Sequence, residues 1–345
     1  MKQDQLSRRD FIAGAIAGSV AVAAAIVPGG AAAQATPSRT GGGPIKLRYG
    51  HSQPVGHSTD QAANRFIDLV KERTNGEVII DLFPNNQLGV DRELQMMIET
   101  NQLDFTHSNS ATMGNFLPQI GVMDLPFIWQ SYEHYLRVVD GPFSEQINAL
   151  LAKATGHRYL AWWFDGFRHV YTSKRPINEL ADMTGLKIRS PEAKVFVDTF
   201  KALGANPTPL AFPEIYTGLE AGVIDGFEGA NGIVYSSKVY EVAKHRAVTG
   251  HIMVGFGMTT ASQRFASLPP DIQEIITTAA QEVQAFQREL QLGEEDEIVE
   301  KMIADGVQET KPDLAPFREA CAKVHDEFHA AHDTGALRDL ITAAA

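Results

Sequence analysis

The sequence predicts an α/β fold with parallel strands. Three observations support this prediction: helical and strand-like hydrophobic patterns alternate along the chain, one helix-to-strand junction occurs twice, and a helical pattern of about 36 residues lies near the C-terminus. Alternating strands and helices are typical of sheets that are covered by helices. Without its first 35 residues the chain retains about 300 residues, which is long enough for two domains.

The first predicted elements form a β-α-β unit. Apolar residues alternate across 45–49, as a strand requires. From Ser58 they recur at helical spacing, Asn75-Gly76 ends that helix, and 78–83 is the next apolar strand. The later predicted pairs are a helix around 93–99 with a strand at 103–107, and helix–strand pairs around 191–203 and 213–227.

The repeated junction lies at 98–105 and again at 219–226. Each copy has an apolar residue and a glutamate, three further residues, then an apolar residue and an aspartate. Any helix-to-strand turn can produce such a pattern. If each domain holds one copy, residues 106–109 and 227–231 lie at the carboxyl ends of strands, where α/β sheets bind ligands. The binding site is then expected between two lobes.

The helical pattern near the C-terminus runs from Pro270 to Asp305 with apolar residues on one face. A helix of about 36 residues is about 54 Å long, which exceeds what one lobe needs. We therefore expect it to bend or to run from one lobe to the other.

Residues 1–35 have the pattern of an export signal. Arg8-Arg9 precedes an uncharged, alanine-rich run that ends in Ala33-Gln34-Ala35, so we expect cleavage after Ala35. The arginine pair is typical of twin-arginine export into the periplasm, with an ordinary secretory signal as the alternative. No cysteine near the cleavage site offers a lipid anchor. Residues 36–43 are a predicted linker.

Composition excludes several classes of partner and site. The net charge is −12, and it becomes −13 without residues 1–35, because 27 basic and 40 acidic residues remain. No basic run suits nucleic acid. The only cysteine, Cys321, excludes an internal disulfide and cysteine-ligated clusters. His325, His329 and His332 are within reach of one another on a predicted helix, but they also suit a solvated face, and we expect no metal there.

No motif for a catalytic nucleophile, a zinc protease, a P-loop or a dinucleotide site occurs in the chain. We therefore expect no catalytic residue and no cofactor. The aromatic run at 162–167, which includes Trp163, suits either a buried core or a surface against which a ligand packs.

Two arginines predict a carboxylate site. Arg168 lies at the start of a predicted strand, and Arg189 ends the apolar stretch 185–188. A strand-end arginine can be an ordinary surface charge. A guanidinium group that faces a cleft, however, can bind a carboxylate through two charge-assisted hydrogen bonds, which suits recognition of an organic acid.

The longest motif occupies 185–228. Gly-Leu-Lys-Ile-Arg-Ser-Pro is followed by Pro-Leu-Ala-Phe-Pro-Glu and then by Val-Ile-Asp-Gly-Phe-Glu. Upstream lie Leu-Phe-Pro-Asn-Asn-Gln-Leu-Gly at 82–89 and Leu-Asp-Phe-Thr at 103–106. Together these motifs resemble the solute-binding subunits of tripartite ATP-independent periplasmic (TRAP) transporters, the DctP family, over essentially the whole mature chain.

The resemblance implies a periplasmic-binding-protein-like fold, in which two α/β lobes are joined by crossing strands and a long helix around a ligand cleft. By position we assign residues 44–165 and 255–294 to lobe I. Residues 166–254 and 295–345 are assigned to lobe II.

The resemblance also implies roles for single residues. Arg189 pairs with the ligand carboxylate and Arg168 is the second arginine of the site. Phe212 packs against the ligand, and Asn109 supplies a polar contact.

One departure from the family pattern follows Glu228, which we include in the predicted site. Many members that bind acids have an asparagine at the position of Gly229, so its role passes to Asn231 or is lost. Trp163, Phe167 and Phe212 suggest a ligand with an apolar face.

The function implied by the resemblance is capture of a small organic acid and its delivery to membrane permease subunits, driven by an ion gradient and without chemistry on the acid. A periplasmic enzyme that acts on a small acid and a binding protein that serves a chemoreceptor are the alternatives. Sugar acids, hydroxy or keto acids, and aromatic acids are all candidate ligands.

Overall fold

The computed structural model describes residues 43–345, which belong to one compact unit. The predicted signal, its cleavage site and all but the last residue of the predicted linker lie outside the described residues. No helix within 43–345 is long and apolar enough to cross a bilayer.

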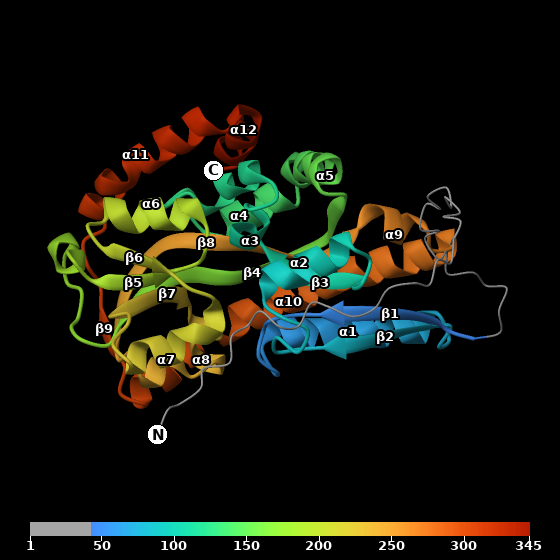
Figure 1. Ribbon diagram of the computed structural model, residues 1–345, viewed down its shortest axis with the longest axis horizontal. Coiled ribbons are helices and arrows are strands. Elements are labelled where there is room, and N and C mark those ends of the chain that lie inside the picture. Colours follow the sequence, from blue (N-terminus) through green and yellow to red (C-terminus); the bar gives the residue numbers. More distant parts are fainter. Residues whose placement is uncertain (1–42) are drawn as a thin grey trace, which may run out of the picture. The chain divides into compact units, whose positions relative to one another are not determined.

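Nine strands form one mixed sheet in the order β2-β1-β3-β8-β4-β7-β5-β6, and β9 pairs with β8 (Figure 1). The strands are β1 (Ile45–Gly50), β2 (Val78–Phe83), β3 (Phe105–Asn109), β4 (His157–Thr172), β5 (Lys187–Ser190), β6 (Asn206–Pro209), β7 (Gly226–Ala230), β8 (His245–Ala261) and β9 (Gln308–Thr310). The α/β class is confirmed, and so are the β-α-β unit and the strand at 78–83.

Parallel pairing holds only within two groups of strands. β1 pairs in parallel with β2 and β3, and β5 pairs in parallel with β6 and β7. The two long strands β4 and β8 lie between these groups and pair antiparallel with each other. β4 also pairs antiparallel with β7, and β8 pairs antiparallel with β3. The sheet is therefore mixed. The parallel architecture that the sequence predicts is present within the two outer groups of strands, but it is wrong for the central strands β4 and β8.

Strand β4 corrects one predicted boundary. Arg168 does not begin a strand, because β4 starts at His157 and passes through it. Asp165-Gly166 looks like a strand end in sequence, but in the structure it forms an irregularity where the register of β4 against β8 shifts between Phe164 and Phe167. Gly166 has φ 109° there, a conformation that favours glycine.

The helices lie on both sides of this sheet (Figure 1). They are α1 (Ser58–Arg73), α2 (Asp91–Glu99), α3 (Ser110–Met113), α4 (Tyr132–Val139), α5 (Pro142–Ala154), α6 (Lys194–Ala202), α7 (Ile215–Glu220), α8 (Asn231–Ser236), α9 (Ser262–Ala266), α10 (Pro270–Ala304), α11 (Ala315–Ala331) and α12 (Gly335–Ala343). Short 3-10 turns lie at Pro118–Asp124, Leu180–Met183, Phe212–Glu214 and Val239–Glu241.

The long helix α10 agrees with its predicted span to within one residue. Its first part packs Ile276 and Val283 into the hydrophobic cluster around β1, β3 and β4. Its last part packs Ile298 and Met302 into a second cluster that contains Phe227 of β7. The helix therefore runs between two hydrophobic clusters, as expected.

Lobe boundaries stay a prediction, because the described residues cluster as one unit. The C-terminal segment, which the prediction places in lobe II, shares the first hydrophobic cluster with residues assigned to both lobes. Val324, Leu337 and Ile341 belong to the first hydrophobic cluster, and α12 contacts α5.

Side chains of α10 satisfy the backbone of β4 near its irregularity. The Gln287 amide donates to the carbonyl oxygen of Phe164 at 2.9 Å, and its carbonyl accepts from the Phe164 N–H at 3.3 Å. Gln291 donates to the carbonyl oxygen of Asp165 at 2.9 Å. Both glutamines are buried. They supply hydrogen-bond partners to backbone groups of β4 that the pairing with neighbouring strands leaves without partners at the irregularity.

We expect Gln287→Ala to lower the free energy of unfolding by about 1–3 kcal/mol, because it leaves the Phe164 backbone groups buried without partners. Urea denaturation measures this loss. Gln281→Ala is the matched control, since Gln281 lies on the same helix and is exposed. Equal stability of the two variants would contradict the proposed support of β4.

Candidate functional site

A cavity of about 130 Å³ lies where the ends of β3 and β5 approach the centre of β4 and β8. Its apolar lining includes Val90, Phe212, Ile233, Val254 and Phe256. Its charged lining residues are Asp91, Arg92, Asp165, Arg168, Arg189 and Glu192. A mostly apolar wall with a few charged groups is typical of a small-ligand site.

Arg189 is a buried cation in this cavity. It lies on β5 with 4% of its surface exposed, and its Nε donates to the carbonyl oxygen of Leu210 at 2.9 Å. Its guanidinium carbon is 5.9 Å from the centre of the Phe212 ring. Burial lowers the pKa of Arg189 to about 10, so the group stays charged at neutral pH. Among residues 43–345 no carboxylate forms an ion pair with it, so its charge is available to an anion.

Arg168 differs from Arg189 because a carboxylate already pairs with it. Its Nε and Nη2 both donate to the carboxylate of Glu228, the latter at 2.7 Å, and Nη2 also donates to the Glu228 carbonyl oxygen at 3.0 Å. Burial alone would raise the pKa of Glu228, but Arg168 outweighs it and lowers this pKa to about 2. Glu228 therefore lies behind Arg168 and neutralises it, and it does not line the cavity.

Asn109 reaches the cavity from the end of β3, where it also begins α3. Its Oδ1 accepts from the Thr112 N–H at 2.6 Å, which caps that helix. Its Nδ2 donates to Oδ2 of Asp91 at 2.9 Å. The position expected for Asn109 agrees with the structure, but its amide is already engaged with α3 and Asp91.

Trp163 and Asn231 lie elsewhere. Trp163 is fully buried in the first hydrophobic cluster and does not line the cavity, so of its two sequence interpretations the structure favours the core. Asn231 accepts hydrogen bonds from Tyr171 and Arg246 and donates to Glu295. These contacts occupy its amide away from the cavity lining.

Gly229 has little space for the asparagine that relatives were expected to place there, because its neighbours would have to shift to admit a side chain. A Cβ at this position would lie 3.0 Å from Cγ2 of Val234 and 3.3 Å from the Phe227 ring. The structure therefore brings Arg189, Arg168, Phe212 and Asn109 together in the cavity, but not Glu228, Asn231 or Trp163. Binding by the first four stays a prediction.

Sequence reasoning missed Asp91 and Asp165. Both line the cavity, Asp91 at the start of α2 and Asp165 at the irregularity of β4. An available signal was the single charge inside the aromatic run 162–167, because an aspartate within a buried strand needs a partner or a ligand. Phe256 was also missed, since nothing in the sequence of β8 distinguishes it from its buried neighbours.

The C-terminal histidines have other partners. His325 contacts the Pro126 carbonyl oxygen at 2.7 Å, and His329 contacts Oγ1 of Thr334 at 2.8 Å. Within 43–345 no group of three or more histidine, cysteine or acidic residues could hold a metal ion.

A family model described as DctP, bacterial extracellular solute-binding protein, family 7, matches residues 49–331. The chain belongs to this family. Its members include the solute-binding proteins of TRAP transporters, so the predicted family is confirmed. The chain is 33% identical over 284 residues to the 2,3-diketo-L-gulonate-binding periplasmic protein YiaO of Escherichia coli (strain K12), and the match covers 82% of this chain and 86% of that one.

Many solved structures are similar to this chain, and two of them illustrate the likeness. The sugar acid binding protein DctPAm from Advenella mimigardefordensis, in complex with galactonate, has 27% sequence identity and a TM-score of 0.84, and the match covers 88% of this chain and 99% of that one. A TRAP periplasmic solute-binding protein from Polaromonas, bound to D-erythronate, has 32% identity and a TM-score of 0.82, with 87% and 98% covered. These structures confirm the predicted periplasmic-binding-protein-like fold.

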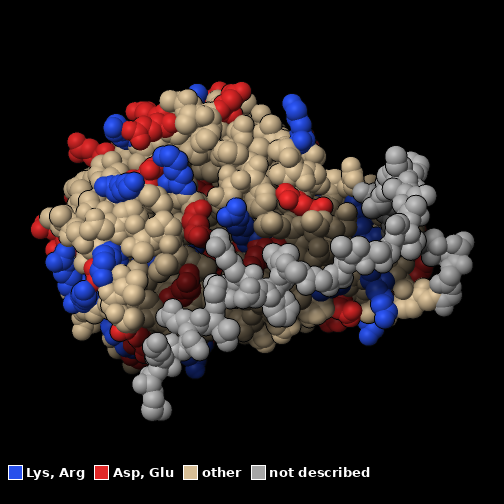
Figure 2. Space-filling view, viewed as in Figure 1, with Lys and Arg blue, Asp and Glu red and all other residues tan. Residues whose placement is uncertain are grey.

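Acidic and basic side chains are scattered among uncharged ones over the face seen in Figure 2, and no continuous basic patch covers that face.

Proposed function

We propose that this member of the DctP family is the extracytoplasmic binding subunit of a TRAP transporter. It captures a small organic acid in the cavity and delivers the acid to membrane permease subunits without performing chemistry on it. Export to the periplasm follows from the predicted signal at 1–35. The observation that carries the proposal is Arg189, a buried cation in the cavity with no carboxylate partner among the described residues.

An unpaired buried charge is unfavourable, so its presence needs a compensating ligand. A carboxylate matches the planar guanidinium in charge and shape, and Phe212 beside it offers an apolar surface to the carbon chain of the acid. The relatives support this assignment, because several bind sugar acids or other acids.

A thermal-shift screen of organic acids tests the proposal. At a hundredfold excess over its dissociation constant a ligand adds about 2.7 kcal/mol of stability, so we expect a clear rise in Tm with at least one acid. The neutral alcohol of the same carbon skeleton is the control, and we expect no rise with it. The bound acid should be recovered chemically unchanged. Stabilisation by the neutral alcohol alone, or conversion of the acid to a product, would overturn the proposal.

A further inference from the structure

The cavity contains an aspartate whose hydrogen-bonding capacity is only partly used. Asp165 has 4% of its surface exposed, and its Oδ1 lies 3.3 Å from Nε2 of His57. The Nδ1 atom of His57 accepts from the Thr59 N–H at 3.2 Å, whereas His57 Nε2 and Asp165 Oδ1 are both buried without a hydrogen-bond partner among the described residues. Among residues 43–345 none donates a hydrogen bond to Oδ2 of Asp165, which leaves this oxygen for a ligand.

Asp91 is a second acidic group of the cavity. Its Oδ2 accepts from Asn109, and its Oδ1 lies 3.9 Å from Nε2 of His107, too far for a hydrogen bond. Burial raises the pKa of Asp91, although hydrogen bonds and the charge of Arg189 oppose this shift. Asp91 and Asp165 therefore contribute two acceptors of hydrogen bonds and no counter-charge for a second acid group.

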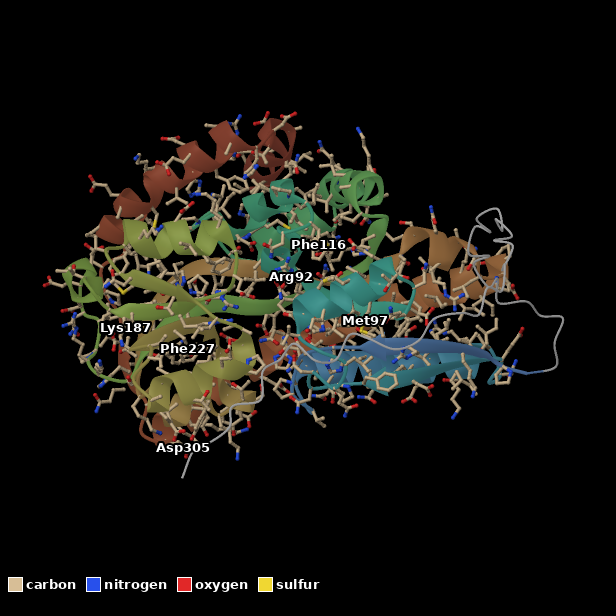
Figure 3. All side chains as sticks on the ribbon, in the orientation of Figure 1. Arg92, Met97, Phe116, Lys187, Phe227 and Asp305 are labelled. Carbon is tan, nitrogen blue, oxygen red and sulfur yellow. The ribbon has the colours of Figure 1, made fainter. Side chains whose placement is uncertain are left out.

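The buried charges of the cavity fit one carboxylate. Glu228 neutralises Arg168, and Arg189 has no ion pair with a described residue. Arg92 also lines the cavity, from α2 (Figure 3), but its side chain is exposed and solvent screens its charge. A second carboxylate on the ligand would lie in the same enclosed space as Asp91 and Asp165, which repel it.

Ionised carboxylates only accept hydrogen bonds, so the ligand groups that match them must donate. Hydroxyl groups along a carbon chain need one acceptor each. Asn109 already occupies Oδ2 of Asp91, so Oδ1 is its one open acceptor. Hydroxyl groups spaced along a carbon chain can donate one hydrogen bond to each aspartate.

We propose that the cavity selects a polyhydroxylated acid with one carboxylate and rejects the dicarboxylate of the same skeleton, an inference that rests on the proposed function. Asp165 is the residue that determines this specificity. It accepts a hydrogen bond from a ligand hydroxyl and repels a second carboxylate.

Calorimetric titration with matched pairs of acids tests this inference. The pairs are galactonate with galactarate, gluconate with glucarate, and erythronate with meso-tartrate, and the members of each pair differ only in whether the end carbon is oxidised to a second carboxylate. We expect wild type to bind the monocarboxylate of at least one pair tighter by on the order of tenfold or more. In Asp165→Asn this preference falls by on the order of tenfold, because the repulsion is lost and the hydroxyl contact is weakened.

Asp81→Asn is the matched control. It removes the same charge from an exposed position on β2 outside the cavity, so we expect the wild-type preference to persist. Asp91→Asn is a second test, and we expect it to lower the preference for the monocarboxylate, as Asp165→Asn does. It replaces Asp165→Asn as the test if circular dichroism shows that the latter does not fold.

Three results would overturn the inference: equal or tighter binding of the dicarboxylates by wild type, tighter binding of an amino acid than of any hydroxy acid, and an unchanged preference in both folded aspartate variants. If only acids without hydroxyl groups bind, this inference fails and the proposed function stands. If no acid binds wild type at all, the proposed function itself fails, and the two failures are thereby distinguished.

Discussion

Replacing Arg189 with alanine is expected to weaken binding of the cognate acid by about 2–5 kcal/mol. The substitution removes the one buried cation of the cavity that no described carboxylate neutralises, and the charge of the ligand is then desolvated without a partner. Calorimetric titration of the acid into the folded variant measures the loss. Near-normal affinity in Arg189→Ala would contradict the assignment of Arg189 as the carboxylate anchor.

Arg189→Lys serves as the conservative comparison. Lysine keeps the positive charge but lacks the planar pair of donors, and it cannot hold both the Leu210 carbonyl and a carboxylate in one plane. We expect it to recover only part of the lost affinity. Circular dichroism should show the wild-type fold in both variants, because Arg189 has only one protein hydrogen bond among the described residues.

Replacing Glu228 with alanine is expected to lower the free energy of unfolding by about 3–5 kcal/mol. Arg168 would then be buried without its carboxylate, and it has 8% of its surface exposed. Urea denaturation at pH 7 measures the loss. Asp198→Ala is the control, because it breaks the ion pair with Lys194, a side chain that is 80% exposed, and we expect little change.

The same pair predicts a pH dependence. Arg168 lowers the pKa of Glu228 in the folded protein to about 2 from an ordinary value of 4.5. The stability that this shift contributes is fully present above pH 4.5 and is lost as the pH falls toward 2. The difference in stability between wild type and Glu228→Ala should therefore shrink when the pH is lowered from 5 through 2. A difference that stays constant over this range would contradict the buried pair.

Elements with strong local periodicity could be predicted from the sequence. The boundaries of α1 and α10 follow from helical spacing and from local end signals, and both agree with the structure to within a residue. The course of β4 could not be predicted in this way. Asp165-Gly166 is a local signal for a strand end, and the chain continues through it because Gln287 and Gln291, more than a hundred residues later, satisfy the backbone.

The residues of the candidate site that lie within one contiguous sequence motif could be predicted from the sequence. Arg189 and Phe212 lie in the motif 185–228, and both line the cavity. Asn231 lies next to the same motif, but a hydrogen-bond network with Tyr171 and Arg246 engages it, and only the three-dimensional contacts show this. Asp165 was missed for the opposite reason, since its neighbours in sequence are core residues while its side chain reaches the cavity.

The antiparallel pair β4 and β8 also has a consequence for the timing of folding. β4 is synthesised before β5, β6 and β7, yet its partner β8 follows all three, and β8 in turn pairs with β9 near the C-terminus. His134 of α4 contacts the carbonyl oxygen of Ile341 at 2.8 Å, so even the last helix completes a structure begun much earlier. Such distant pairings form slowly, and the sheet cannot be completed before β8 and β9 have been synthesised. A protein that matures only after synthesis is suited to an export route that carries folded proteins, which is the route that Arg8-Arg9 predicts.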